Sequence, residues 1–243
     1  VPDSARVTDT FDPMRKLLFP LNTTFLGLLC PTQADSFYVS KEGDDSSSGR
    51  APVEAFLTIS RGVRDLKAGD TLIVRPGVYR EQVLFEKSGT KDRPITIKSE
   101  IPQQAELVGS VRLKDWIPVQ GRRQVFKTTL RLATDLVYEK DTETKYTEVA
   151  SLDMLEDEPG TFMYEEEEKT LYVHPSDDLG MAHHVIDACL WRYGIGALTT
   201  NPPRKHLPRS VGLVIDGFAV RDYATAGIFI RNADYCTIKN CVV

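Results

Sequence analysis

The C-terminal stretch 212–243 contains two rows of apolar residues at a constant separation. Within each row, apolar residues occur at every second position, then a break follows, and two more apolar residues come after it. Alternation with period two indicates a strand, and the break indicates a bend between strands. Equivalent positions lie 23 residues apart in the two rows, which are Leu213, Ile215, Phe218 and Val220, then Cys236, Ile238, Cys241 and Val243. A repeat of this length predicts a β-solenoid, and a parallel β-helix above all.

The segment "PVEAFLTISRGVRDLKAGD" predicts one helix that begins at Pro52 and ends before Gly69. Its apolar residues fall on one stripe, which needs a core to cover. A helix across the end of a solenoid would shield the first strand and the open core. The stripe consists of Phe56, Ile59, Val63 and Leu66.

Short strands are predicted before and after the turn at Pro76-Gly77. "DTLIVRPGVYRE" places Leu72 and Val74 on one face, and "PITIKS" does the same with Ile95 and Ile97. Between about 111 and 179 the solenoid repeat is absent, although "QVFKTTL" and "DLVYEK" still indicate strands. The segment "GTFMYEEEEKTLYVHP" predicts a hairpin whose acidic tip, 165–168, is better explained by solvation than by calcium.

Residues 37 to 110 resemble the N-terminal portion of secreted right-handed parallel β-helix proteins of the pectate-lyase-like superfamily. The resemblance lies in "FYVSKEGDDSSSGR", "AFLTISRGVRDLKAGDTLIVRPGVYREQV" and "SGTKDRPITIKSE", and the ending "IDGFAVRDYATAGIFI" with "CTIKNC" is similar to later coils. It implies an all-β fold, a right-handed parallel β-helix with an N-terminal capping helix. The middle section resembles the small β-domain inserted into some β-helix glycoside hydrolases.

These observations predict four parts of the chain. Residues 1–34 form a leader, with a secretory signal peptide from about Met14, because a basic start precedes an apolar stretch too short to span a membrane. Residues 35–110 form the cap and first coils, 111–180 the inserted β-domain, and 181–243 further coils. Because the chain ends on a strand, we expect more coils beyond Val243, and the leader predicts a secreted, periplasmic or cell-surface protein.

Composition excludes few functions but gives no support to nucleic-acid binding. The net charge is -5, with 27% charged and 41% hydrophobic residues, and the charges are not gathered in long blocks. The cysteines outside the leader are odd in number, and the histidines lack zinc-ligand spacing except for the adjacent pair His183 and His184, which cannot both face one side of a strand. We therefore predict no metal and no cofactor. Asp44 and Asp45 fit an ordered loop better than a calcium site.

In the resembling proteins, substrate lies on the outer faces of stacked strands and on the loops between them. The carboxylates available there for glycoside hydrolysis are Asp216 and Asp222. A polysaccharide lyase would instead use Arg221 and Arg231, and only that chemistry would call for calcium. The basic loop "PPRKHLPR" supplies substrate-binding candidates for an anionic glycan, Arg204, Lys205 and Arg209.

The resemblance thus implies a secreted protein that binds a polysaccharide or oligosaccharide. Glycoside hydrolysis is the first expectation, with the active site largely beyond residue 243. The alternatives are a polysaccharide lyase and a non-catalytic carbohydrate-binding or surface β-helix protein.

Overall fold

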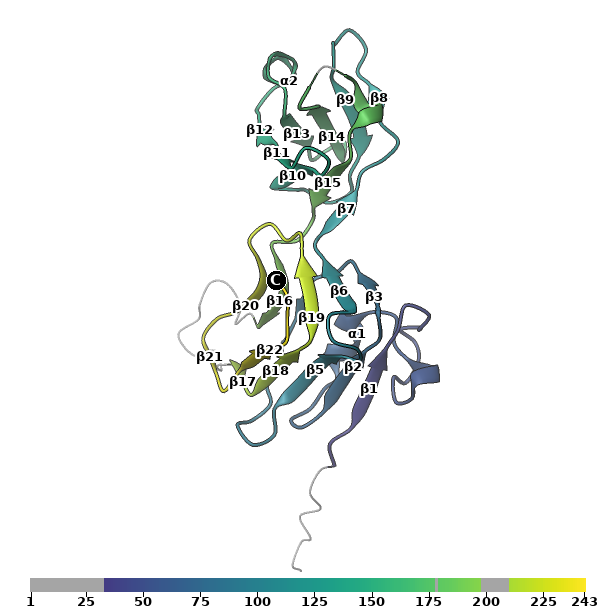
Figure 1. The fold of residues 1–243 in the computed structure, drawn as a ribbon, viewed down its shortest axis with the longest axis vertical. Helices are drawn as coiled ribbons and strands as arrows, with labels where there is room; N and C mark the ends of the chain where they lie inside the picture. The colour runs from purple at the N-terminus through teal and green to yellow at the C-terminus, as the bar shows by residue number, and fades with distance from the viewer. Residues whose placement is uncertain (1–32, 178, 198–209) are drawn as a thin grey trace, which may run out of the picture. The chain divides into compact units, whose positions relative to one another are not determined.

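The computed structural model describes residues 33–177, 179–197 and 210–243. Over these residues the protein is all-β, with few helices and several separate sheets (Figure 1), which confirms the predicted class. In the part of the chain so described, no helix is long and apolar enough to cross a membrane. The leader before Gln33 and the loop with Arg204, Lys205 and Arg209 lie outside the described residues.

Most strands in the first and last parts of the chain pair in parallel. The largest parallel sheet has five strands, in the order β1 (Ser36–Val39), β2 (Thr71–Val74), β5 (Ile95–Ser99), β18 (Leu213–Asp216) and β22 (Thr237–Lys239). A second sheet consists of β3 (Gly77–Tyr79), β6 (Ala105–Val108) and β19 (Phe218–Arg221). A third consists of β4 (Val83–Leu84), β16 (Tyr193–Ala197) and β20 (Ala226–Ile230), and β17 (Ser210–Val211) pairs with β21 (Ala233–Asp234).

The chain visits these three sheets in a constant order. From β2 it passes to β3 and β4, and from β18 it passes to β19 and β20, so each sheet gains one strand per passage. Residues 23 apart pair in the last two passages, as Val214 does with Thr237 and Ala219 with Val242. The break in each apolar row has a left-handed backbone, with φ of 76° at Gly217 and 56° at Asn240. Glycine and asparagine are the residues that adopt this conformation most readily.

Parallel register stacks like residues on like. One column across the five-stranded sheet contains Phe37, Leu72, Ile97, Ile215 and Ile238. The three central residues of this column are at most 1% exposed, whereas Ile238 on the edge strand is 48% exposed. Successive strands lie about 4.8 Å apart, so the side chains of such a column are in contact along its whole length.

The predicted single helix from Pro52 is wrong in extent. A 3₁₀ turn, η1 (Pro52–Glu54), is followed by extended backbone and then by a short helix, α1 (Ile59–Arg64). Phe56 causes the interruption, because it forms a parallel bridge with Val39 of β1. Thr58 caps α1, and the Glu81 carboxylate accepts the N–H groups at the start of the helix. The apolar stripe is nevertheless buried, and α1 packs against β1, β2 and β4.

The acidic loop at 44–45 is ordered by hydrogen bonds to its own carboxylates. Asp44 accepts hydrogen bonds from the backbone and hydroxyl of Ser46, and Asp45 accepts from Leu57 and Thr58, so both carboxylates order the loop. The acidic tip at 165–168 is exposed.

The strands between 110 and 189 pair differently. One antiparallel sheet has the order β11 (Thr144–Lys145), β10 (Leu136–Glu139), β15 (Ile186–Cys189) and β7 (Ser110–Arg112). The other, which is mixed, has the order β12 (Thr147–Glu148), β13 (Thr161–Glu165), β14 (Thr170–His174), β9 (Phe126–Thr129) and β8 (Ile117–Pro118). The short helices here are α2 (Leu152–Asp157) and η2 (Met181–His183).

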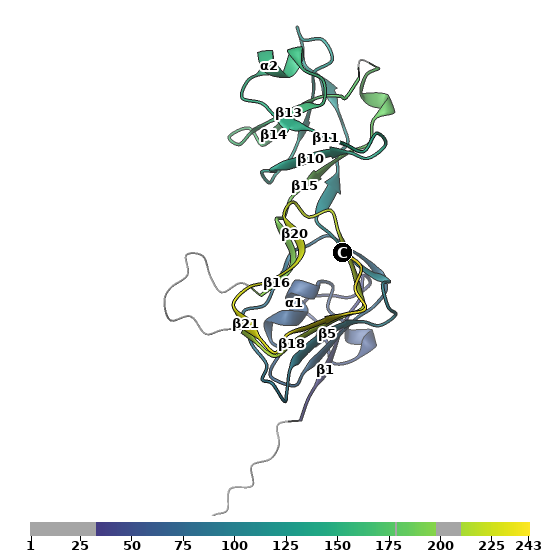
Figure 2. The same ribbon diagram turned by 60° about the vertical axis from the view of Figure 1, so that its left-hand side comes forward.

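This antiparallel section has its own core. Phe162 and Leu171 are buried at its centre, and β13 and β14 form the hairpin expected from the sequence, with Phe162 opposite Val173. The chain passes from β6 into the antiparallel section at Gly109 and passes from this section to β16 after Leu190. At this junction the Leu190 N–H donates to the Gly109 carbonyl, with 2.8 Å between N and O. Both views in Figures 1 and 2 show these two connecting segments side by side.

The stacked column predicts unequal costs for one substitution at two of its positions. Ile97→Ala removes a fully buried side chain and should lower the free energy of unfolding by about 2–5 kcal/mol. Ile238→Ala, in the same column but half-exposed, should cost less than about 1.5 kcal/mol. Urea denaturation of both variants measures the difference, and equal costs would contradict the described packing.

Candidate functional site

A pocket of about 250 Å³ lies where the antiparallel section meets the end of β19. It receives side chains from β7, β10 and β15 and from the turn that follows β19. Gly109 lies beside it, and a Cβ there would come within 2.4 Å of the Tyr223 ring, so only glycine allows this close approach. The lining consists of Ser110, Leu136, Tyr138, Lys140, Asp187, Cys189, Asp222 and Tyr223.

Asp222 is the carboxylate at the centre of the charges in this pocket. It adopts a left-handed backbone with φ of 61° directly after β19. Its Oδ1 accepts from Lys140 Nζ at 2.6 Å, and its Oδ2 accepts from Arg221 Nη1 at 2.6 Å. Burial alone would raise the pKa of Asp222, but the Lys140 ammonium and the Arg221 guanidinium outweigh burial and lower it. Asp222 is therefore ionised at neutral pH.

A second carboxylate, Asp187, lies on the same side of the pocket. Asp187 is 4% exposed and accepts a hydrogen bond from Arg112 Nε. The Ser110 hydroxyl oxygen lies 3.5 Å from one carboxylate oxygen of Asp187 and 3.5 Å from one of Asp222. These two oxygens are therefore at most about 7 Å apart.

Further polar contacts extend this network beyond the pocket lining. Arg221 Nε also donates to Glu106 of β6, so Arg221 connects the Glu106 carboxylate with that of Asp222. Arg80 donates to the backbone carbonyl of Ser110. In this network Lys140 pairs with Asp222, and Arg112 pairs with Asp187. Arg221 pairs with both Asp222 and Glu106.

Two tyrosines give the pocket its aromatic surface. Tyr223 donates its hydroxyl to the Glu81 carbonyl at 2.6 Å, and burial together with the Glu81 charge raises the pKa of Tyr223. Lys140 Nζ lies 4.9 Å from the centroid of the Tyr138 ring, a cation–π contact. Burial also raises the pKa of the Cys189 thiol to about 11, so this cysteine is a neutral packing group.

The structure brings together only part of the residues suggested by sequence. Arg221 and Asp222 belong to one network, whereas Asp216 on β18 forms an ion pair with Lys239 and accepts from Asn240. Arg231 is exposed after β20 and does not line the pocket. Lys140 and Asp187 were not predicted, although an aspartate inside the buried strand "VIDAC" was a usable signal, because buried charges occur paired.

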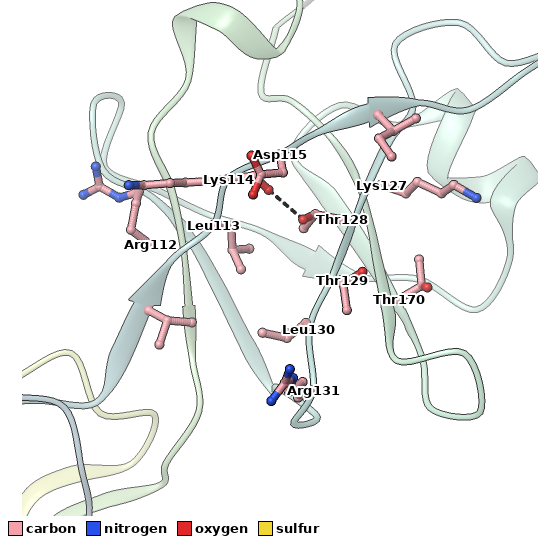
Figure 3. A pocket seen from close by; sticks show the side chains of 12 residues that line it. Arg112, Leu113, Lys114, Asp115, Lys127, Thr128, Thr129, Leu130, Arg131 and Thr170 are labelled. Carbon is pink, nitrogen blue, oxygen red and sulfur yellow. Dashed lines mark hydrogen bonds between the residues drawn. The ribbon is translucent and has the colours of Figure 1, made fainter.

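A larger pocket of about 620 Å³ lies within the antiparallel section (Figure 3). Its edge is held by a hydrogen bond from the Thr128 hydroxyl to the Lys114 carbonyl, 2.6 Å long and drawn as a dashed line. Four basic residues and one acidic residue contribute to its lining, and one of the basic residues, Arg112, is paired with Asp187. The five residues are Arg112, Lys114, Lys127, Arg131 and Asp115.

A third polar cluster surrounds Glu139, which is fully buried at the end of β10. Burial alone would raise the pKa of this carboxyl, but four hydrogen-bond donors outweigh burial and lower the pKa to about 2. The carboxylate is therefore held ionised inside the section. The donors are the side chains of Tyr146, Thr142, His184 and Ser176.

Comparisons with known proteins give partial likenesses. Residues 53–117 match the sequence profile of the family described as Chondroitinase B. The uncharacterized protein YwoF of Bacillus subtilis (strain 168) is 34% identical over 65 residues, 27% of this chain and 14% of YwoF.

Solved structures are similar over more of the chain. The complex of XylC with xylose has a TM-score of 0.57 and 21% identity, covering 79% of this chain and 36% of XylC. A structure named as a glycoside hydrolase has a TM-score of 0.49 and 12% identity, covering 76% of this chain and 50% of that protein. This chain thus shares a fold with XylC and spans about a third of its length.

The Glu139 cluster predicts a specific acid sensitivity. In the folded state the pKa of Glu139 lies near 2, below the ordinary 4.5. The hydrogen bonds to the Glu139 carboxylate therefore stabilise the folded protein fully above pH 4.5, and this stabilisation is lost as the pH falls toward 2. Glu139→Gln should lower stability at pH 7 and flatten the decline between pH 5 and 2. Thermal unfolding across this pH range tests it, with the exposed Glu143→Gln as control; equal slopes in wild type and Glu139→Gln would contradict the expectation.

Proposed function

We propose that this chain is part of a secreted carbohydrate-active protein, a glycoside hydrolase in the first instance. In this proposal the three parallel sheets are the faces of a right-handed parallel β-helix. The strands between 110 and 189 are an insertion into its second coil. The constant order in which the chain visits the sheets supports the β-helix, and so does pairing between residues 23 apart.

The observation that carries the hydrolase proposal is the pocket beside β19. It holds two carboxylates, Asp187 and Asp222, whose nearest oxygens are at most about 7 Å apart, next to the Tyr138 and Tyr223 side chains. Sugar recognition needs this combination of charged hydrogen-bonding groups and apolar ring surface in one concave site. The relatives named XylC and glycoside hydrolase agree with this class of substrate.

The charges in the pocket suggest what each carboxylate would do. Asp222 is ionised, and about 17% of its side chain is exposed, so it suits the role of base or nucleophile. Asp187 is buried and forms an ion pair with Arg112, which suits a role in sugar binding or positioning. A hydrolase also needs a protonated carboxyl group, and in this proposal that acid comes from a part of the protein outside the pocket.

A polysaccharide lyase is the second candidate. Basic residues at the rim of the pocket in Figure 3, among them Lys114 and Arg131, would pair with the carboxylate of a uronic acid, and the matched profile carries the name of a lyase, Chondroitinase B. Lyase chemistry requires this charge to be neutralised next to the proton that is abstracted. A non-catalytic carbohydrate-binding protein would use the same two pockets for recognition alone.

We expect the full-length protein to release new reducing ends from a panel of neutral glycans without forming unsaturated sugars. Asp222→Asn should lower kcat by about 100-fold or more if Asp222 is the base. The matched control is Asp216→Asn, which removes a carboxylate from the end of the neighbouring β18 outside the pocket and should retain wild-type activity.

The products separate the candidate functions. Absorbance from unsaturated sugars on uronic-acid substrates would replace the hydrolase with the lyase. Glycan binding measured by calorimetry without turnover would support the binding protein. Neither binding nor turnover across neutral and acidic glycans would overturn the carbohydrate proposal.

A further inference from the structure

A group of metal-ligating side chains lies in the antiparallel section, and none of them lines either of the two pockets described above. Glu139 ends β10 and Asp141 follows in the next turn, while His184 comes from the segment after η2. One ligand atom from each of these three residues lies within 4.8 Å of the others. Asp177, from the segment after β14, contacts His184 from its other side.

The charges of this group are not balanced by basic residues. Glu139 is fully buried, and the His184 side chain is 2% exposed. Among the described residues, the ion pairs of Glu139, Asp141 and Asp177 are made only with His184. Three carboxylates thus share one imidazole, and a buried carboxylate is costly unless a cation accompanies it.

The His184 ring shows where a cation would sit. Its Nε2 lies 3.1 Å from Asp177 Oδ1, and its Nδ1 lies 2.9 Å from Glu139 Oε1 and 3.9 Å from Asp141 Oδ2. A neutral imidazole carries one N–H only. With its N–H on Nδ1 the ring donates to Glu139. With its N–H on Nε2 the ring donates to Asp177, and the Nδ1 lone pair then faces the carboxylate oxygens of Glu139 and Asp141, which is the arrangement that a metal ion between these three atoms would use.

We propose that Glu139, Asp141 and His184 bind a divalent metal ion, with zinc as the preferred ion. One imidazole nitrogen with two carboxylate oxygens is a donor set that zinc accepts, whereas calcium takes oxygen ligands. Zinc bonds of about 2.0–2.2 Å place neighbouring ligand atoms about 3.3–3.6 Å apart, and the distances in this group lie on both sides of that range.

Asp177 is not a ligand in this proposal, but its carboxylate accepts a hydrogen bond from the second ring nitrogen of the ligand His184. Metal-binding histidines usually donate their second ring N–H to such a group, which fixes the tautomer and the ring orientation. Tyr146 and Ser176 hold the Glu139 carboxylate in the same way. The site joins β10 to the segments before β15, so a bound ion would stabilise the antiparallel section and is independent of the carbohydrate proposal.

The test is titration of the chelator-treated full chain with zinc chloride, followed by calorimetry and by thermal unfolding. We expect one zinc per chain and a higher melting temperature with zinc. Asp141→Asn removes a ligand that is partly exposed, so this variant should fold and lose the binding. Asp177→Asn should keep one site with about 10–100-fold weaker affinity.

Glu143→Gln is the matched control, because Glu143 is an exposed acid in the same turn outside the group. It should bind zinc as the wild type does. Absence of stoichiometric binding, or equal binding by Asp141→Asn, would overturn the proposal.

Discussion

In-register pairing between successive parallel strands determines where the other parts of the molecule lie. Ile97, Ile215 and Ile238 stack in one column because their backbones pair residue for residue. The same register brings the ends of equivalent strands together. Gly109 after β6 donates to the carbonyl of Arg221, the last residue of β19. The chain therefore enters the antiparallel section directly beside Asp222, and this is why a pocket forms there.

The chemistry of that pocket depends on charges from distant parts of the sequence. Asp222 belongs to the parallel strands, whereas Lys140 and Asp187 belong to the antiparallel sheet. Partly buried ion pairs gain strength from a low local dielectric, but each partner becomes costly when it is left alone. The network therefore gives a defined position to the junction, and it keeps the Asp222 carboxylate ionised at the pocket.

Local pattern was a good guide to the strands and a poor one to the helix. Alternation identified Leu72, Val74, Ile95 and Ile97, and all four are buried, because a strand that covers a core shows its pattern over a few residues. Phe56 fits both a helical stripe and a strand bridge. Its pairing with Val39 decides between them, and no local pattern contains that contact.

The candidate site could be predicted from sequence only where its parts are neighbours in the chain. Arg221 and Asp222 are adjacent, so both were found. Lys140 lies 82 residues from Asp222, and nothing in its own neighbourhood indicates a partner. The same holds for the group around His184, whose partners Glu139, Asp141 and Asp177 come from two other segments, so metal-ligand spacing could not reveal it.

The hydrogen bond between Leu190 and Gly109 has a consequence for how such a protein can change over evolution. Gly109 and Leu190, where the antiparallel section begins and ends, lie next to each other. The pairing of the parallel strands is therefore unaffected by the length or sequence of the segment between these two residues. Duplication, exchange or loss of the intervening segment would leave their register intact. A scaffold of this kind can acquire new recognition surfaces at one position while its core sequence stays under the same packing constraints.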